Sequence, residues 1–185
     1  MENQFFTTFS STFNTFTIVW KEIGSELRIQ RIFLSDSEHK SEVKALKYFK
    51  QIKSESSSSI ASLGERIQRF LSGRQVDFTL EYLDFTMCNK IQRKVLLADS
   101  KIPRGWVSTY KRIANNISIP MGARVVGNAL ARNPFPIVIP CHRAIKTNGD
   151  LGGFQGGTTM KRKLLELEGI EFSERGKVIT DRIYY

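Results

Sequence analysis

The residues best suited to covalent chemistry stand together in one short stretch. Cys141 and His142 are adjacent in "NPFPIVIPCHRAI", although the chain of 185 residues holds only two cysteines and two histidines. A free thiol has a pKa near ~8.5 and is mostly protonated at neutral pH, whereas the thiolate is the nucleophile. A neighbouring imidazole can take that proton, and a carboxylate on its other nitrogen would orient the ring. The pair therefore indicates a nucleophilic cysteine.

Sequence adjacency alone does not bring the two side chains together. Neighbours on an extended backbone point to opposite sides, so a sharp turn or a bridging water is required. The alternatives are a buried core thiol and a structural histidine. Zinc would need Cys88, Cys141, His39 and His142, which lack ligand spacing, so we predict no metal site. A Cys88–Cys141 bridge stays open, although free thiols in a reducing compartment, with Cys88 in a core, are the simpler prediction.

The charge of the chain points to its partners. Lys and Arg number 28 against 18 Asp and Glu, which gives a net charge of +10 and a pI near 9.8. Such an excess favours polyanions, nucleic acid above all, although a solvated Lys-rich surface would also produce it. The N-terminus lacks the basic and apolar regions of a signal peptide, and no stretch has the roughly 18 apolar residues of a membrane span. We expect a soluble, cytoplasmic protein without membrane contact.

The first 85 residues read as a domain of strands and helices. Phe16 to Trp20 and Glu26 to Ser35 are β-like, and the second helical pattern, from Ile60 to Leu71, precedes a capping glycine. An earlier helix should place Val43, Leu46 and Phe49 on one face. The segment "KSESSSS" is expected to be a loop. Alternation in "VDFTLEYLDF", residues 76–85, predicts a further half-buried strand.

From residue 86 onward the pattern changes to helices and tight turns, so we place the domain boundary between residues 85 and 86. A helix through Ile91 and Leu96 should end at "KIPRG". "STYKRIANNISIPMGARVVGNALARN" then reads as two short helices, with Ser108 capping the first and Pro120 opening the second. Two helices joined in this way are typical of helix-turn-helix DNA-binding domains.

Several ordered motifs around the Cys-His pair carry a family resemblance. "NPFPIVI", "PCHR", "GDLGGFQGG" and "KLLELEG" follow one another as in the O6-alkylguanine-DNA alkyltransferases, the methylated-DNA–protein-cysteine methyltransferases. The resemblance covers nearly all of Thr86 to Gly169. It implies an α/β N-terminal domain of the ribonuclease-H-like kind, residues 1–85, assigned by position and pattern. It also implies a mainly α C-terminal domain of winged-helix or helix-turn-helix type, residues 86–185.

The resemblance also implies roles for five reactive-site residues. Cys141 would accept the alkyl group, and His142 would act as its base through a water. Glu168 would orient His142, and Asn133 would hold the turn that carries the cysteine. Tyr110 would donate a proton or a hydrogen bond to the purine as negative charge leaves O6.

Recognition of the substrate would fall to residues on either side of the cysteine. The resemblance implies that backbone groups of Cys141, Ala144 and Gln155 contact the base and that the ring of Phe154 forms one wall of the pocket. Many members have tyrosine and serine where this chain has Phe154 and Gln155, which puts tolerance for bulky adducts in doubt. Because the reacting oxygen is inside the stack, the nucleotide must flip out. Arg124 would fill the gap, and the small residues Ala123 and Gly127 would permit approach to the minor groove.

The expected function is DNA repair by single-turnover alkyl transfer. An alkyl group on O6 of guanine, with O4-alkylthymine as a second substrate to consider, would pass irreversibly to Cys141, because the resulting thioether is not hydrolysed at neutral pH. No cofactor is needed, and we expect a monomer on double-stranded DNA. The alternative is a non-catalytic, lesion-recognising DNA-binding module or transcription regulator. A cysteine hydrolase, a third option, is disfavoured by the charge and the helix pair.

Overall fold

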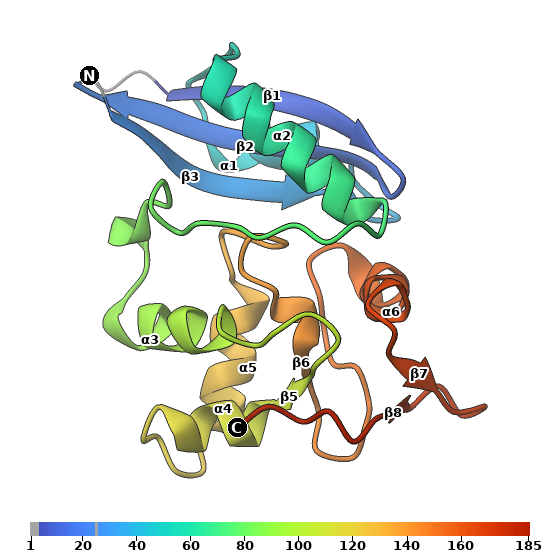
Figure 1. Ribbon diagram of the computed structural model, residues 1–185. Coiled ribbons are helices and arrows are strands. Elements are labelled where there is room, and N and C mark those ends of the chain that lie inside the picture. The colour runs from blue at the N-terminus through green and yellow to red at the C-terminus, as the bar shows by residue number, and fades with distance from the viewer. Residues whose placement is uncertain (1–3, 25) are drawn as a thin grey trace. The chain divides into compact units, whose positions relative to one another are not determined.

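The chain divides into two compact units, each with a hydrophobic cluster of its own (Figure 1). The computed structural model describes residues 4–24 and 26–185. Unit 1 holds the N-terminal residues up to Met87 together with Pro134–Val138, and unit 2 holds Cys88–Asn133 and Ile139–Tyr185. Nothing in the sequence pattern indicated that five residues next to the cysteine belong with the N-terminal unit.

Unit 1 is built on a four-stranded sheet of order β3-β2-β1-β4. Its strands are β1 (Gln4–Ser11), β2 (Asn14–Ile23), β3 (Glu26–Leu34) and β4 (Ile52–Ser54). The first three pair antiparallel, and β4 adds to β1 in parallel. The two strands predicted around Phe16 and Glu26 are confirmed. The Phe-rich segment before them is also a strand, β1, which the sequence reading missed.

Two helices, α1 (Ser41–Tyr48) and α2 (Ser58–Leu71), contact this sheet through side chains that alternate along β1. Phe6 lies opposite Val19 and packs with Ala45 of α1 in one apolar cluster. Phe9 projects the other way and packs under α2, where a Cβ added to Gly64 would lie 2.3 Å from its ring. Figure 1 shows α2 lying across the sheet. Because successive side chains of β1 point to opposite faces of the sheet, α1 packs on one face and α2 on the other.

Three expectations for unit 1 are wrong. Residues 76–85 form no strand. Among the described residues, a single isolated β-bridge, Ile29 with Leu83, joins them to the sheet, and this is too little pairing for a strand. The Ser-rich stretch, residues 53–59, is only in part a loop, since it contains the last two residues of β4, the N-terminal cap Ser57 and the first two residues of α2. On α1, Val43 and Leu46 are about half exposed and Ala45 is buried instead.

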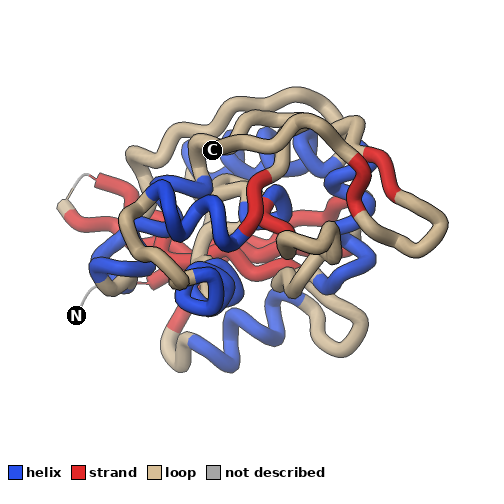
Figure 2. The backbone as a smooth tube through the Cα atoms, turned by 90° about the horizontal axis from the view of Figure 1, so that it is seen from below, coloured by secondary structure: helices blue, strands red, loops and turns tan. Residues whose placement is uncertain are grey.

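Unit 2 is mainly helix and loop, with strands of only two residues (Figure 2). Its elements are α3 (Lys90–Asp99), β5 (Ser108–Thr109), α4 (Tyr110–Asn116), α5 (Ala123–Ala131), the 3-10 turn η2 (Cys141–Arg143), β6 (Ala144–Ile145), α6 (Gly157–Leu167), β7 (Glu171–Phe172) and β8 (Val178–Ile179). Another 3-10 turn, η1 (Phe85–Met87), ends unit 1. The predicted helices near Ile91 and in the pair α4–α5 are confirmed.

The ends of the helix pair differ from the prediction. Thr109, not Ser108, caps α4 by accepting a hydrogen bond from the Arg112 N–H. Helix α5 begins after Gly122, so Pro120 lies in the turn and not at its first position. That turn is tight, because Ser118 and Met121 both have positive φ angles.

A small core fixes the two segments that carry the Cys-His pair and Glu168. Val107, Ile145, Leu165 and Ile170 form one buried cluster. Strand β6, which follows η2 directly, pairs in parallel with β5, and Leu165 lies in the last turn of α6. Packing in this core therefore sets the position of η2 relative to the end of α6. Within the described residues, none of the helices has the length and apolar character that crossing a membrane requires.

Candidate active site

Cys141 and His142 lie on a turn of 3-10 helix, not on an extended strand. The turn follows Pro140, whose carbonyl accepts a hydrogen bond of 2.8 Å from the Arg143 N–H. Cys141 is 6% exposed and His142 is fully buried. The sharp turn that the sequence argument required is therefore present. The two cysteines are not joined by a disulfide, and Cys88 is half-buried and not in a core.

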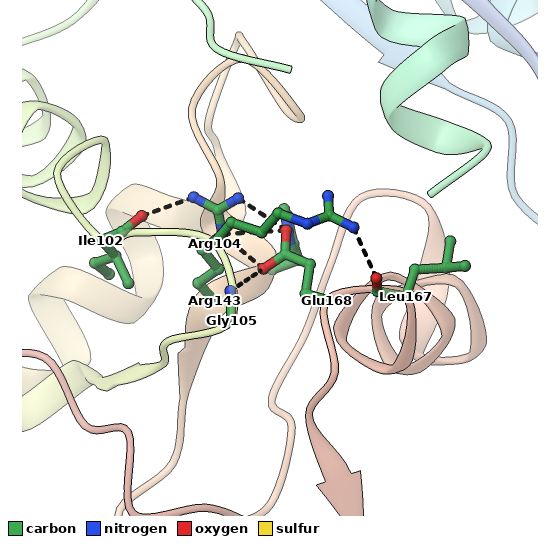
Figure 3. A network of polar contacts seen from close by, with 7 residues as sticks. Ile102, Arg104, Gly105, Arg143, Leu167 and Glu168 are labelled. Carbon is green, nitrogen blue, oxygen red and sulfur yellow. Dashed lines mark hydrogen bonds and ion pairs between the residues drawn. The ribbon is translucent and has the colours of Figure 1, made fainter. Parts of the chain in front are cut away.

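The buried carboxylate of Glu168, at the end of α6, is hydrogen-bonded to His142. The His142 Nε2 lies 2.9 Å from Oε1 of Glu168. Arg143 binds the same carboxylate in a fork, with Nε 2.9 Å from Oε2 and Nη2 2.8 Å from Oε1 (Figure 3). The backbone N–H of Gly105 donates to it at 3.3 Å. Bidentate, charge-assisted bonds of this kind hold a carboxylate in one orientation.

The protonation states of this network follow from its contacts. Burial alone would raise the pKa of the Glu168 carboxyl, but His142 and Arg143 together hold it well below its ordinary value. Burial lowers the pKa of His142, and Glu168 only partly opposes that effect. A neutral imidazole beside an ionised carboxylate must donate from Nε2, which makes Nδ1 the acceptor. The ring is thus set to receive a proton.

The thiol itself is held in its protonated form. Burial, together with the charge of Asp99, raises the pKa of Cys141 to about 12, although a hydrogen bond from Asn133 and the charge of Lys161 oppose the shift. At pH 7 the thiol therefore keeps its proton. A preformed thiolate is therefore not the resting state, and the proton must leave as sulfur forms its new bond.

Asn133 is the last residue of unit 2 before the segment Pro134–Val138, which belongs to unit 1, and Ile139 is the first residue after it. The side-chain Nδ2 of Asn133 donates to the carbonyl of Ile139 at 3.1 Å, so this hydrogen bond joins the two residues that flank the segment. The cysteine follows two residues later, and its own N–H binds the same Ile139 carbonyl at 2.8 Å. Asn133 and the Cys141 N–H thus share one acceptor, and the role of Asn133 in holding the turn of the cysteine stays a prediction.

Tyr110 opens α4 and lies against the glycine-rich loop. A Cβ added to Gly152 would lie 2.4 Å from the Tyr110 hydroxyl, so only glycine leaves room for the phenol here. Burial, followed by the charges of Cys141 and Asp99, raises the pKa of Tyr110 to about 12. The phenol therefore stays protonated and can donate a hydrogen bond. The structure brings it into electrostatic range of Cys141.

The three residues predicted to line the base pocket, Ala144, Phe154 and Gln155, all follow the thiol in the sequence. Ala144 is fully buried directly after η2, and its carbonyl accepts a bond of 2.6 Å from Lys161 Nζ. The half-buried ring of Phe154 meets the His142 ring edge to face, 6.2 Å between centroids. Gln155 follows it in the same loop and is also half-buried. The Phe154 ring thus packs against the imidazole that follows Cys141.

The predicted DNA-contacting residues form the start of α5. Arg124 is exposed, and Ala123 and Gly127 are half-buried. A Cβ added to Gly127 would meet no atom within 4 Å, so this glycine borders open space and not a tight helix contact. Unit 2 also holds 17 of the 28 basic residues but only 7 of the 18 acidic ones, whereas the remaining 11 of each kind balance in unit 1. The whole excess of +10 therefore lies on the unit that carries Cys141.

Three charged residues around the thiol were missed by the sequence reading: Arg143, Lys161 and Asp99. Arg143 was visible in "PCHR", where a cation next to the Cys-His pair could have suggested a partner for the orienting carboxylate. Lys161 and Asp99 gave no signal, because charged residues on helices are usually solvated. Both are fully buried in the folded chain.

Comparison with known proteins shows the family of the chain. Residues 90–170 match the family model described as 6-O-methylguanine DNA methyltransferase, DNA binding domain. The chain is similar to the methylated-DNA–protein-cysteine methyltransferase of Methanothermobacter thermautotrophicus, 48% identical over 111 residues, 60% of this chain and 62% of that relative. It is also similar to the enzyme of the same name from Sulfolobus acidocaldarius, 40% identical over 61% of this chain and 70% of the relative. The chain belongs to the methylated-DNA–protein-cysteine methyltransferase family.

Solved structures of the methyltransferase family share the fold. Mycobacterium tuberculosis OGT in complex with DNA is similar with a TM-score of 0.69 at 27% identity, over 88% of this chain and 91% of that chain. The similarity thus includes the sheet and helices of unit 1, which the family model does not cover. The chain spans 62% of the length of the first of the relatives above.

Proposed function

We propose that the chain is a DNA repair protein that moves an alkyl group from O6 of guanine in DNA to the sulfur of Cys141, once per molecule. It would act as a methylated-DNA–[protein]-cysteine S-methyltransferase without a cofactor. The observation that carries the proposal is the buried His142–Glu168 pair, joined at 2.9 Å directly behind the residue that bears the thiol. Family membership and the DNA complex of a related protein support it.

The step requires one proton to leave the thiol and one to reach the purine. His142 Nδ1 would take the thiol proton through a water while Glu168 stabilises the imidazolium. Sulfur forms a bond to the alkyl carbon, and the bond from that carbon to O6 breaks with its electron pair passing to guanine. Tyr110 would donate a hydrogen bond to the ring as charge develops. The proton that His142 took from the thiol would then pass through water to guanine, which completes the exchange of the alkyl group for a proton. Atoms and charge balance without a further reactant.

Access to O6 requires the nucleotide to leave the stack, at a cost of about a few kcal/mol. Arg124 on the exposed start of α5 would occupy the gap, with Ala123 and Gly127 against the minor groove. Ala144, Phe154 and Gln155 would line the base pocket. We further propose a ribonuclease-H-like N-terminal domain, a winged-helix C-terminal domain starting near residue 86, and an intracellular monomer. The net charge of unit 2 supports the orientation of this unit toward DNA.

Intact-protein mass after incubation with an O6-methylguanine duplex tests the proposal. One methyl group should be added per molecule in the wild type and in Cys88→Ala, the matched control for the other cysteine. Cys141→Ala should gain no mass. Methyl gain by Cys141→Ala would refute the assignment. Tight binding to the modified duplex with no mass change in the wild type would favour the alternative, a lesion-recognising DNA-binding module without catalysis.

A further inference from the structure

The buried carboxyl of Asp99 has no part in the mechanism above. It is the last residue of α3 and is fully buried. In the part of the chain that the structure describes, neither of its oxygens accepts a hydrogen bond. The buried Glu168, by contrast, accepts bonds from His142, Arg143 and Gly105. A buried carboxylate without hydrogen bonds is costly, whereas the neutral acid is far less so.

Asp99 lies within a cluster of ionisable side chains from several elements. Those whose charges it affects or feels are Cys141 and Arg143 of η2, Lys161 of α6, Tyr110 of α4 and Tyr185 near the C-terminus. Burial raises the pKa of Asp99 to about 7, with Lys161 and Arg143 opposing the shift. The cluster thus contains a carboxyl that titrates in the neutral range.

The two cations of the cluster are directed elsewhere. Arg143 gives its fork to Glu168 and its Nη1 to the carbonyl of Ile102 at 2.7 Å. Lys161 Nζ donates to the carbonyl of Ala144 at 2.6 Å and to that of Gly153 at 3.4 Å. Ala144 lies three residues from Cys141. The ammonium of Lys161 is therefore bound to the backbone that follows the reactive turn, and not to Asp99.

Asp99 and Lys161 act on the sulfur in opposite directions. The positive charge of Lys161 lowers the pKa of the Cys141 thiol, and an ionised Asp99 raises it. If Asp99 is ionised, its negative charge opposes the electrostatic stabilisation that Lys161 provides for a negative charge on the sulfur. If Asp99 is protonated, the charge of Lys161 acts on the sulfur without that opposition. The state of one buried proton thus decides the field at the nucleophile.

We propose that Asp99 is a positioning residue that must carry a proton for Lys161 to support the developing thiolate of Cys141. The inference rests on the proposed alkyl transfer and adds a pH limit to it. The rate should fall as Asp99 ionises, in the direction opposite to that of simple thiolate chemistry. No proton passes from Asp99 to the substrate, since its role is electrostatic.

Single-turnover transfer from a saturating methylated duplex tests the inference in Asp99→Asn, which keeps the shape and removes the charge. With half-ionisation near pH 7, wild-type Asp99 is mostly protonated at pH 6 and about nine-tenths ionised at pH 8. The Asn variant should therefore match the wild type at pH 6 and exceed it by about tenfold at pH 8. Asp181→Asn, an exposed carboxylate of the same unit, should follow the wild type at both pH values. An equal Asn-to-wild-type ratio at pH 6 and pH 8 would overturn the inference.

A second measurement does not depend on transfer or on the fold of a variant. Infrared titration of the wild-type protein should show the carbonyl band of a protonated carboxylic acid at pH 6, lost as the pH rises through about 7. Absence of such a band at pH 6 would sink the inference. If the wild type transfers no methyl group while the band is present, the proposed function fails and the buried protonated acid stands.

Discussion

Replacing Glu168 with glutamine should weaken the fold as well as the chemistry. The carboxylate accepts from His142, from both Nε and Nη2 of Arg143, and from the N–H of Gly105. Glutamine has one acceptor oxygen, and its amide group would point donor hydrogens at donors. It would also leave the guanidinium of Arg143, a residue only 9% exposed, without its counter-charge.

Removing one partner of a buried ion pair costs roughly 3–5 kcal/mol. In a chain of this length each kcal/mol shifts the melting temperature by about 2–4 °C, so Glu168→Gln should melt roughly 6–20 °C lower. Because His142 also loses the group that orients it and stabilises its charged form, transfer by the folded fraction should slow by roughly 10²–10⁴-fold. Affinity for the duplex should change little, since Glu168 is buried and faces the imidazole.

Glu166→Gln is the matched control. Glu166 lies two residues earlier, is 45% exposed at its side chain and pairs with Arg162 on the same helix surface. Exposed pairs contribute roughly 0–1 kcal/mol, so this variant should melt within a few degrees of the wild type and transfer normally. Thermal denaturation, duplex binding and single-turnover transfer, measured well below both melting temperatures, separate stability from chemistry.

Two results would contradict the reasoning. If Glu168→Gln has the same melting temperature as Glu166→Gln, the ion pair between Glu168 and Arg143 does not stabilise unit 2. If the folded Gln variant loses duplex affinity but transfers normally once bound, Glu168 does not orient His142. The second result would remove the assignment of Glu168 as the residue that orients the base, whereas the first would remove only its stabilising role.

Three further predictions concern the surroundings of the thiol. Gly152→Ala should displace the Tyr110 hydroxyl and slow transfer by up to roughly 10²-fold, whereas Gly153→Ala, where an added Cβ meets nothing within 4 Å, should not; single-turnover rates decide. Arg124→Ala should slow transfer from duplex but not from the free modified base, with exposed Arg175→Ala as control in the same assay. The pKa of Asp99 is higher in the folded chain, about 7 against 3.8, so its stabilising effect is complete below pH 3.8 and is lost as pH rises through 7. The free energy of unfolding of Asp99→Asn should therefore rise by up to about 4 kcal/mol relative to that of the wild type between pH 4 and pH 8. If the melting temperatures of the two proteins change equally between these pH values, the prediction is wrong.

The sequence by itself determined the order of motifs and most of the helices. "PCHR" and the blocks around it were sufficient to propose Cys141 as nucleophile, with His142 and Glu168 behind it, because family motifs fix residue types at spacings that this chemistry needs. Helical periodicity was sufficient for α2, α3, α4 and α5, since their apolar positions recur at the period of the helix.

The sequence did not predict which segments form strands where strand formation depends on residues that are distant in the chain. Residues 76–85 alternate like a strand, yet they meet the sheet at a single bridge. The Phe-rich start became β1 because Phe6 and Phe9 each find a helix on their own side of the sheet. In both cases tertiary neighbours, and not local propensity, decided whether a ladder of hydrogen bonds formed.

Only the tertiary structure decided the electrostatics of the site. Arg143, Lys161 and Asp99 are far apart in sequence or hidden by the usual expectation that charges are solvated, and folding buries all three around one thiol. Protonation depends on burial and on the distance between charges, and neither quantity can be read from residue order. The sequence therefore predicted which residues react, while the packing of α3, η2 and α6 set the charges around them.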